Sequence, residues 1–325
     1  MEEESDSNSS YYKSDDSSIS GDSSSDDDNR LEFDDYEAFD FPKFNKNLEK
    51  LIFNFNYVQK IPRLPNKLRK LICNRNELKT LPMRLPNSLI KINCSYNNIK
   101  FLPKLPNNLL YFNCRCNKIV KLPTLPNKLR YLNCCFNQLT ILENLPKSLT
   151  KLNCKNNKIE KITNLPDRLK FLGCEYNKLK RLSSDIKLPD SLTHLAFSNN
   201  NIDYLPELPN NLKSLDCSYN KLPNYSVLPE SLKRFYCHGN KITVFPVLPK
   251  KIQILGCGDN LLNSITIPKC LVQLYCDGNK LELIPNIPKT MTILCCSNNE
   301  LKCIPDISDA IYMLFCSSNN ITQLT

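Results

Sequence analysis

The sequence predicts a repeat solenoid of the α/β class, with a curved parallel β-sheet on one side and short extended or 3-10 connectors on the convex side. The template L-x-x-L-x-C-x-x-N-x-L, followed by x-x-L-P-x-L-P-x-x, recurs 14 times. Successive copies begin 20 residues after one another, except for one step each of 19, 21 and 23 residues. Such a register is typical of stacked units that bury a continuous core together, since one unit alone buries very little. The asparagines that mark the repeats are Asn56, Asn76, Asn97, Asn117, Asn137, Asn157, Asn177, Asn200, Asn220, Asn240, Asn260, Asn279, Asn299 and Asn319.

Each repeat is predicted to contain one short strand of the sheet. In the third repeat, LPNSLIKINCSYNNIKFLP (85–103), Leu89, Ile92, Cys94 and Ile99 are expected to point into the core. The residues on either side of Ile92 are expected to face outward, because side chains alternate along a strand. Strands of successive repeats lie about 4.8 Å apart, which predicts a sheet about 60 Å long.

The template asparagine is predicted to close the turn that follows each strand. Its amide carries both a donor and an acceptor, so we expect it to bond the backbone of its own turn and that of the next coil. An unpaired buried polar group costs about 1–3 kcal/mol, so each of these asparagines should contribute about that much to the stability of the chain. In the N-terminal half this structural ladder consists of Asn76, Asn97, Asn117, Asn137, Asn157 and Asn177.

Twelve of the 17 cysteines share one inward position, where free thiols are expected to pack as small hydrophobic groups. Disulfides between neighbouring coils are the alternative, but the opening MEEESDSNSS has no apolar run of a secretion signal. We therefore expect a reducing intracellular compartment, such as the cytoplasm, including that of a host cell. Without a C-x-x-C pair, and with His194 and His238 as the only histidines, neither a metal site nor a cofactor is expected. The ladder cysteines are Cys73, Cys94, Cys114, Cys134, Cys154, Cys174, Cys217, Cys237, Cys257, Cys276, Cys296 and Cys316.

The connectors are rich in proline, which fixes φ and biases the preceding residue toward extended geometry. Most of the 22 prolines lie in the L-P-x-L-P connector, which excludes a long helix there. One connector, RLSSDIKLPDSL (181–192), carries three extra residues before the eighth repeat. This insertion is expected to bulge on the convex side and to mark a kink.

With these motifs, residues 41–325 resemble leucine-rich repeat proteins. The L-P-x-L-P connector with its 20-residue period is similar to the short repeats of secreted bacterial effectors, and the Asn, Ile, Lys and Cys bias resembles repeat proteins of giant amoebal DNA viruses. The resemblance implies a viral or effector-like interaction scaffold without enzymatic activity. Some such effectors carry a separate C-terminal ubiquitin-ligase domain, and here the repeats continue to the last residue.

Residues 1–40 differ from the repeats and are predicted to form a disordered, acidic, Ser-rich tail. They hold 15 Asp or Glu and 11 Ser against Lys13 and Arg30, a net charge of −13. The SSSDDD run (23–28) suits acid-directed kinases, and a purely solubilising tail is the alternative. A third hypothesis is that the tail folds back onto the basic repeats and competes with an anionic partner for the same surface. The aromatic residues of LEFDDYEAFDFPKF (31–44) are expected to cap the first coil.

The repeats are basic, with 41 Lys or Arg against 18 Asp or Glu in residues 41–325, a net charge of +23. At predicted concave positions the first seven coils have a net charge of +8 and the last seven a net charge of zero. Only Glu49 and Glu175 oppose the cations of the first seven coils. The aromatic residues interleaved with those cations are Phe55, Tyr96, Tyr111, Tyr131, Phe136, Phe171 and Tyr176.

This pattern predicts a protein-binding site on the concave face of the basic half, since exposed Tyr and Arg often anchor interfaces. The bland alternative is aromatic stacking between coils with solvated lysines. A second functional reading is polyanion or nucleic-acid binding through the same face. The predicted partner-binding residues are Lys70, Arg75, Lys91, Tyr96, Tyr111, Arg115, Arg130, Tyr131, Phe136, Lys151, Lys155, Phe171 and Tyr176.

Catalysis is not expected. Cys116 and Cys135 lie outside the cysteine ladder and are candidates for exposed thiols, but no histidine lies in their repeats to activate them. The partner is expected to be a protein with an acidic surface, and no membrane contact is expected. The last repeat ends at CSSNNITQLT (316–325), which predicts fraying or end-to-end self-association of an open sheet edge.

Overall fold

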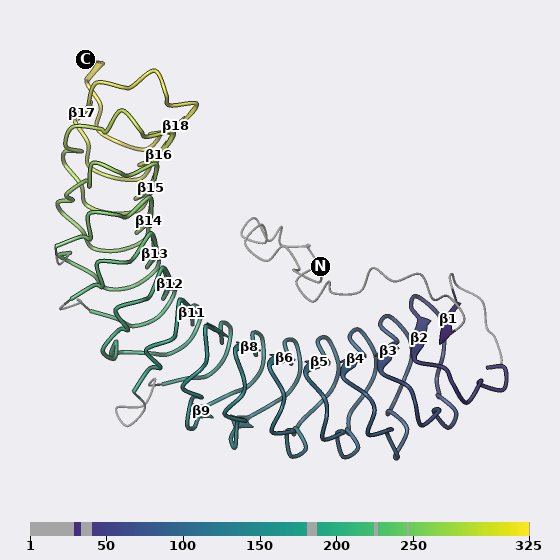
Figure 1. Cartoon of the computed structure of the whole chain (residues 1–325). Helices are drawn as coiled ribbons and strands as arrows, with labels where there is room; N and C mark the ends of the chain where they lie inside the picture. The colour runs from purple at the N-terminus through teal and green to yellow at the C-terminus, as the bar shows by residue number, and fades with distance from the viewer. Residues whose placement is uncertain (1–28, 34–40, 181–186, 224–226, 246, 325) are drawn as a thin grey trace.

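In the computed structural model, residues 29–33, 41–180, 187–223, 227–245 and 247–324 are described. Their main element is a 15-stranded parallel sheet. Figure 1 shows a curved solenoid with this sheet on its inner, concave side and the connectors on its outer side. The strands of the sheet are β1 (Arg30–Phe33), β2 (Lys50–Phe53), β3 (Lys70–Ile72), β4 (Lys91–Asn93), β5 (Tyr111–Asn113), β6 (Tyr131–Asn133), β8 (Lys151–Asn153), β10 (Phe171–Gly173), β11 (His194–Ala196), β12 (Ser214–Asp216), β13 (Arg234–Tyr236), β14 (Ile254–Gly256), β15 (Gln273–Tyr275), β16 (Ile293–Cys295) and β18 (Met313–Phe315).

The strands β2 to β18 of this sheet confirm the predicted repeats, since each repeat supplies one of them. The additional strand β1 lies inside residues 1–40, so the prediction of disorder is wrong for Arg30–Phe33. This segment alternates apolar and charged residues, and it pairs in register with β2, with Phe33 opposite Phe53. Residues 1–28 and 34–40 lie outside the described residues.

The predicted aromatic cap covers the first coil. The ring of Phe41 is 5.9 Å from that of Phe33, 5.6 Å from that of Phe44 and 5.0 Å from that of Phe53, all in edge-to-face geometry. Edge-to-face pairs are favourable at these separations. Because Phe53 takes the ladder position that cysteine occupies in most coils, a large ring is available where the core would otherwise end.

The core is a column of side chains stacked in register. At the central strand position Leu71 lies opposite Ile92, and Ile92 opposite Phe112. Leu89, Ile92, Cys94 and Ile99 are fully buried, as the template predicted. Each coil covers the apolar residues of the one before it, so stability builds up by stacking.

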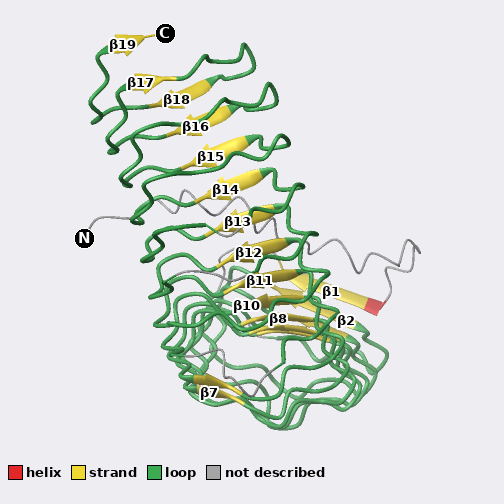
Figure 2. Cartoon of the chain, turned by 90° about the vertical axis from the view of Figure 1, so that its left-hand side faces the viewer, coloured by secondary structure: helices red, strands yellow, loops and turns green. Residues whose placement is uncertain are grey.

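The connectors are extended segments and turns, and the described residues contain no α-helix. In most coils a turn begins at the last proline of the connector; the Leu89 N–H, for example, donates to the Pro86 carbonyl oxygen over 3.2 Å. Proline suits this position because its φ is already fixed. Two pairs of two-residue strands lie outside the main sheet (Figure 2): β7 (Ile141–Leu142) with β9 (Lys161–Ile162), and β17 (Cys303–Ile304) with β19 (Gln323–Leu324).

The solenoid turns between the section that holds β2–β8 and the section that holds β12–β16 (Figure 1). The connector 181–192, whose three extra residues predicted a kink, lies between these sections, and its residues 181–186 lie outside the described residues. The sheet continues across it, with Leu172 of β10 opposite Leu195 of β11. In the described part of the chain, no helix is long and apolar enough to cross a membrane.

Candidate functional site: a cation–aromatic face

The ladder asparagines set the turn that carries the candidate site. The Asn97 side chain accepts the Leu78 N–H over 3.0 Å and donates to the carbonyl oxygens of Cys73 and Cys94 over 3.0 and 3.1 Å. The inter-coil bonds therefore reach the preceding coil, whereas the sequence predicted the next one. Asn76, Asn117, Asn137, Asn157 and Asn177 make the same set of bonds.

The residue before each of these asparagines has a positive φ, in the left-handed region that glycine and asparagine adopt most easily. In the C-terminal half this position is filled mainly by small or polar residues, such as Asn199, Gly239 and Gly278. Other side chains cost about 1–3 kcal/mol there, and such strain collects at functional sites. The N-terminal half nevertheless places Phe55, Arg75, Tyr96, Cys116, Phe136, Asn156 and Tyr176 at this position.

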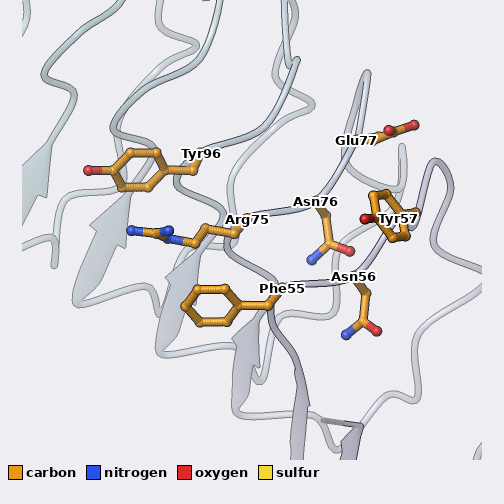
Figure 3. Close-up of a pocket in the computed structure, with 7 residues that line it drawn as sticks. All are labelled: Phe55, Asn56, Tyr57, Arg75, Asn76, Glu77 and Tyr96. Atoms are coloured by element: carbon orange, nitrogen blue, oxygen red, sulfur yellow. The ribbon is translucent and has the colours of Figure 1, made fainter. Parts of the chain in front are cut away.

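Five of the side chains near these turns form a continuous row, named the outer row: Phe55, Arg75, Tyr96, Arg115 and Phe136. The Cζ atom of Arg75 is 4.9 Å from the ring centroid of Phe55 and 5.0 Å from that of Tyr96. The Cζ atom of Arg115 is 5.5 Å from the Tyr96 centroid and 4.9 Å from that of Phe136. Each guanidinium thus lies between two rings, which Figure 3 shows for Arg75.

A second row, named the inner row, uses the first position of the strands: Lys91, Tyr111, Tyr131, Lys151 and Phe171. The Tyr111 and Tyr131 rings stack at 4.2 Å with an interplanar angle of 5°. Lys91 Nζ lies 4.6 Å from the Tyr111 centroid, and Lys151 Nζ lies 5.8 Å from that of Tyr131 and 5.4 Å from that of Phe171. Tyr111 is only 6% exposed, so its ring mainly packs against its neighbours.

The two carboxylates that oppose these cations at the predicted concave positions are Glu49 and Glu175. Glu49 lies 3.7 Å from an Arg69 guanidinium nitrogen, and Glu175 is only 3% exposed. Burial, followed by the like charges of Arg30, Lys70 and Lys91, lowers the pKa of Lys50. The first coils therefore carry a cluster of neighbouring cations, which attracts anions at low salt.

The other predicted partner-binding residues lie around the two rows. Lys155 Nζ is 5.1 Å from the ring centroid of Tyr176, which is 44% exposed. Lys70 begins β3 beside Lys91, and Arg130 is exposed immediately before β6. The sequence prediction of the site omitted Phe55, although it shares the template position of Tyr96.

A shallow pocket of about 370 Å³ adjoins the outer row (Figure 3). Its lining combines the rings of Phe55, Tyr57 and Tyr96 with the polar groups of Arg75 and Glu77, along with Asn56 and Asn76. An aromatic lining with a few polar groups suits a side chain of a partner better than a buried small ligand. No group of three or more His, Cys, Asp or Glu in the described residues is arranged to hold a metal ion.

All 17 cysteines are free. Cys135, predicted to be exposed, is in fact 2% exposed, because its thiol turns inward and donates to Asn153 Oδ1 over 2.7 Å. Burial raises the pKa of the Cys135 thiol, with the charge of Glu175 adding to the effect. The ladder thiols make a bond that the sequence did not predict: that of Cys154, for example, donates to the Gly173 carbonyl oxygen of the next coil over 3.3 Å.

No family model and no curated protein sequence matches the chain. Among solved structures, it is 31% identical to YopM, a leucine-rich effector protein from Yersinia pestis, with a TM-score of 0.80 over 85% of this chain and 79% of that one. The functional domain of InlJ from Listeria monocytogenes, which includes a cysteine ladder, is 30% identical, with a TM-score of 0.69 over 79% of this chain and 60% of that one. Given this match to YopM and the repeated ladder geometry, the chain belongs to the leucine-rich repeat family.

Proposed function

We propose that the chain is a non-enzymatic protein-interaction module that binds its partner on the concave face of the N-terminal half. The observation that carries the proposal is the outer row, in which two arginines are held between three aromatic rings. Leucine-rich repeat solenoids offer long curved surfaces, which suit extended contacts with another macromolecule. Arginine and aromatic side chains are the residues most often found to dominate such contacts.

The order of the two rows supports this role. A side chain already held between rings loses little rotamer freedom when a partner arrives, so the entropy cost of binding is reduced. The left-handed backbone conformation of Phe55, Arg75, Tyr96 and Phe136 also supports this role. Four bulky side chains at positions that favour glycine or asparagine imply that the side chains themselves are needed.

Polyanion or nucleic-acid binding is the second candidate, favoured by the positive charge of the same face. Its usual mechanism combines phosphate contacts with bases stacked on aromatic rings. Here the ring faces of Tyr96 are covered by Arg75 on one side and Arg115 on the other. Base stacking at this ring would have to displace an arginine, so the geometry favours a protein partner.

The cellular location belongs to the same proposal. Free thiols along the whole cysteine ladder fit a reducing intracellular compartment, and the likeness to YopM fits the cytoplasm of a host cell. The resemblance to giant-virus proteins stays a prediction.

Charge reversal in the full chain tests the proposed function. The variant Arg75→Glu/Arg115→Glu/Lys151→Glu is compared with Lys100→Glu/Lys118→Glu/Lys121→Glu, which changes three exposed connector lysines by the same total charge. In affinity capture from a eukaryotic lysate, the native chain and the connector variant should retain one defined protein that the first variant loses. Equal recovery by both variants would exclude this face as the site. Recovery of nucleic acid that nuclease or moderate salt removes would favour the second candidate.

A further inference from the structure

We propose that the outer row reads an extended acidic segment of the partner protein in which a carboxylate recurs at every third residue. Arg75 takes one carboxylate and Arg115 takes the next. This inference rests on the proposed function, because it names the chemistry of the partner at the same site.

The arginines are prepared for this task by their surroundings. A guanidinium stacked between rings keeps its N–H groups in the plane between them, where a carboxylate can accept two parallel bonds. Arg75 is exposed, and Arg115 is half-buried. Within the described residues neither arginine forms an ion pair with a carboxylate, whereas the nearby Arg69 forms one with Glu49.

The spacing of the two arginines selects the conformation of the ligand. Their Cζ atoms lie 5.0 and 5.5 Å from the same Tyr96 centroid, so they are no more than 10.5 Å apart. Two steps between neighbouring strands amount to about 9.6 Å. In a polyproline II segment, residues three apart lie on the same side and about 9.3 Å apart, which matches this spacing. In a β-strand, same-side residues two apart are separated by about 6.6 Å, which is too short.

The composition of such a segment agrees with this conformation. Acidic segments with few apolar residues rarely fold alone, and unfolded chains populate the polyproline II conformation extensively. An open concave face can receive a segment of this kind along the axis of the solenoid. The inner row, parallel to the outer one, then supplies Lys91 and Lys151 to carboxylates on the other side of the segment.

Two peptides of identical composition test the spacing. One is four repeats of Glu-Ala-Pro; the other holds the same twelve residues with the four glutamates in one block. Each carries a fluorophore and is titrated with the full native chain at fixed salt, with binding followed by anisotropy. The repeating peptide should bind about tenfold more tightly than the block, because only it places carboxylates at the arginine spacing.

The variant Arg75→Lys/Arg115→Lys keeps the charge and removes the planar donor pairs. It should reduce the preference for the repeating peptide to about twofold or less, while the matched exposed connector variant Arg63→Lys/Arg84→Lys keeps the full preference. Circular dichroism and a melting curve of each variant check that both remain folded.

Equal binding of the two peptides by the native chain would overturn the inference. If the charge-reversed variant still lost its protein partner in that case, the proposed function would stand and only the spacing would be wrong. A third peptide, helical and with Glu at every seventh residue, tests a helical ligand; tighter binding of this peptide would also overturn the inference. A full-length Asp26→Asn/Asp27→Asn/Asp28→Asn variant tests whether the acidic N-terminal segment of this chain occupies the site. If the peptides bind only to this variant, the site belongs to that segment, and the inference of a separate partner protein is overturned.

Discussion

The ring of Tyr96 lies over the guanidinium group of Arg75, with 5.0 Å between the ring centroid and Cζ. This contact joins adjacent coils, so it contributes to stacking as well as to the proposed site. Exposed cation–aromatic contacts contribute about 0.5–1 kcal/mol. A double-mutant cycle with Tyr96→Leu and Arg75→Ala should give a coupling energy of that size in urea unfolding. Pairing Tyr96→Leu with the remote Arg168→Ala should give additive effects, and additivity in both cycles would contradict the contact.

The asparagine ladder predicts a large difference between two neighbouring residues. Asn157 accepts the Leu139 N–H and donates to the carbonyl oxygens of Cys134 and Cys154, each over 3.0 Å. Asn157→Ala removes these three bonds. It leaves the buried Leu139 N–H without its acceptor, while the carbonyl oxygens of Cys134 and Cys154 keep a bond from Asn137 and Asn177, each over 3.1 Å. The variant should therefore destabilise the chain by about 1–3 kcal/mol. Asn156 has a φ of 55°, so Asn156→Gly should be neutral or slightly stabilising, and Asn156→Ala should cost about 1 kcal/mol. Similar unfolding midpoints for Asn157→Ala and Asn156→Gly would contradict the ladder.

The cysteines should differ sharply in reactivity. Burial raises the pKa of the Cys94 and Cys134 thiols to about 12, so almost no reactive thiolate forms there at pH 8. Cys270 is exposed and should react first with a maleimide. Mass spectrometry after short labelling pulses, with and without urea, measures this order. Labelling of Cys94 in the folded chain as fast as that of Cys270 would show that the ladder is open to solvent.

His238 should make stability depend on pH. Its Nδ1 accepts the Gly258 N–H over 3.0 Å, and burial lowers its pKa, against the opposing effect of Asp216, Asp259 and Asp277. A histidine whose pKa is lowered in the folded chain does not affect stability while the pH is above its pKa in the unfolded chain, about 6.5. As the pH falls below that value, the free energy of unfolding decreases by at most about 1.4 kcal/mol per pH unit. Urea unfolding at pH 7.5 and 5.5 should show this loss, and His238→Asn should reduce it. An equal pH dependence in the variant would assign the effect to other groups.

The strand β18 ends the sheet order, and large apolar side chains in it and beside it are exposed. Tyr312, immediately before the strand, is 70% exposed, and Phe315 within it is 54% exposed. An open edge with apolar neighbours favours pairing with a second copy of the chain. Sedimentation at rising concentration should show self-association that Tyr312→Lys/Phe315→Lys removes, while Tyr57→Lys/Phe101→Lys, two exposed aromatic residues far from β18, leaves it intact. A native chain that stays monomeric at high concentration would contradict this prediction.

The position of the core could be predicted because it depends only on the repeat. Ile92, Cys94 and Asn97 have the same neighbours in every coil, so periodicity alone assigns their roles. The strand β1 could not be predicted, because it has no template of its own. Its four residues order only against β2, and the acidic composition around them indicated disorder.

The candidate site shows the same division. The sequence by itself determined the family, the number of coils, the buried positions and the basic character of the N-terminal half, because each follows from residue type and a 20-residue register. Only the tertiary structure decided that Arg115 lies between Tyr96 and Phe136, that Tyr111 is buried, and that Cys135 turns inward. These features depend on side chains about 20 residues apart in sequence, whose contacts are set by how one coil stacks on the next.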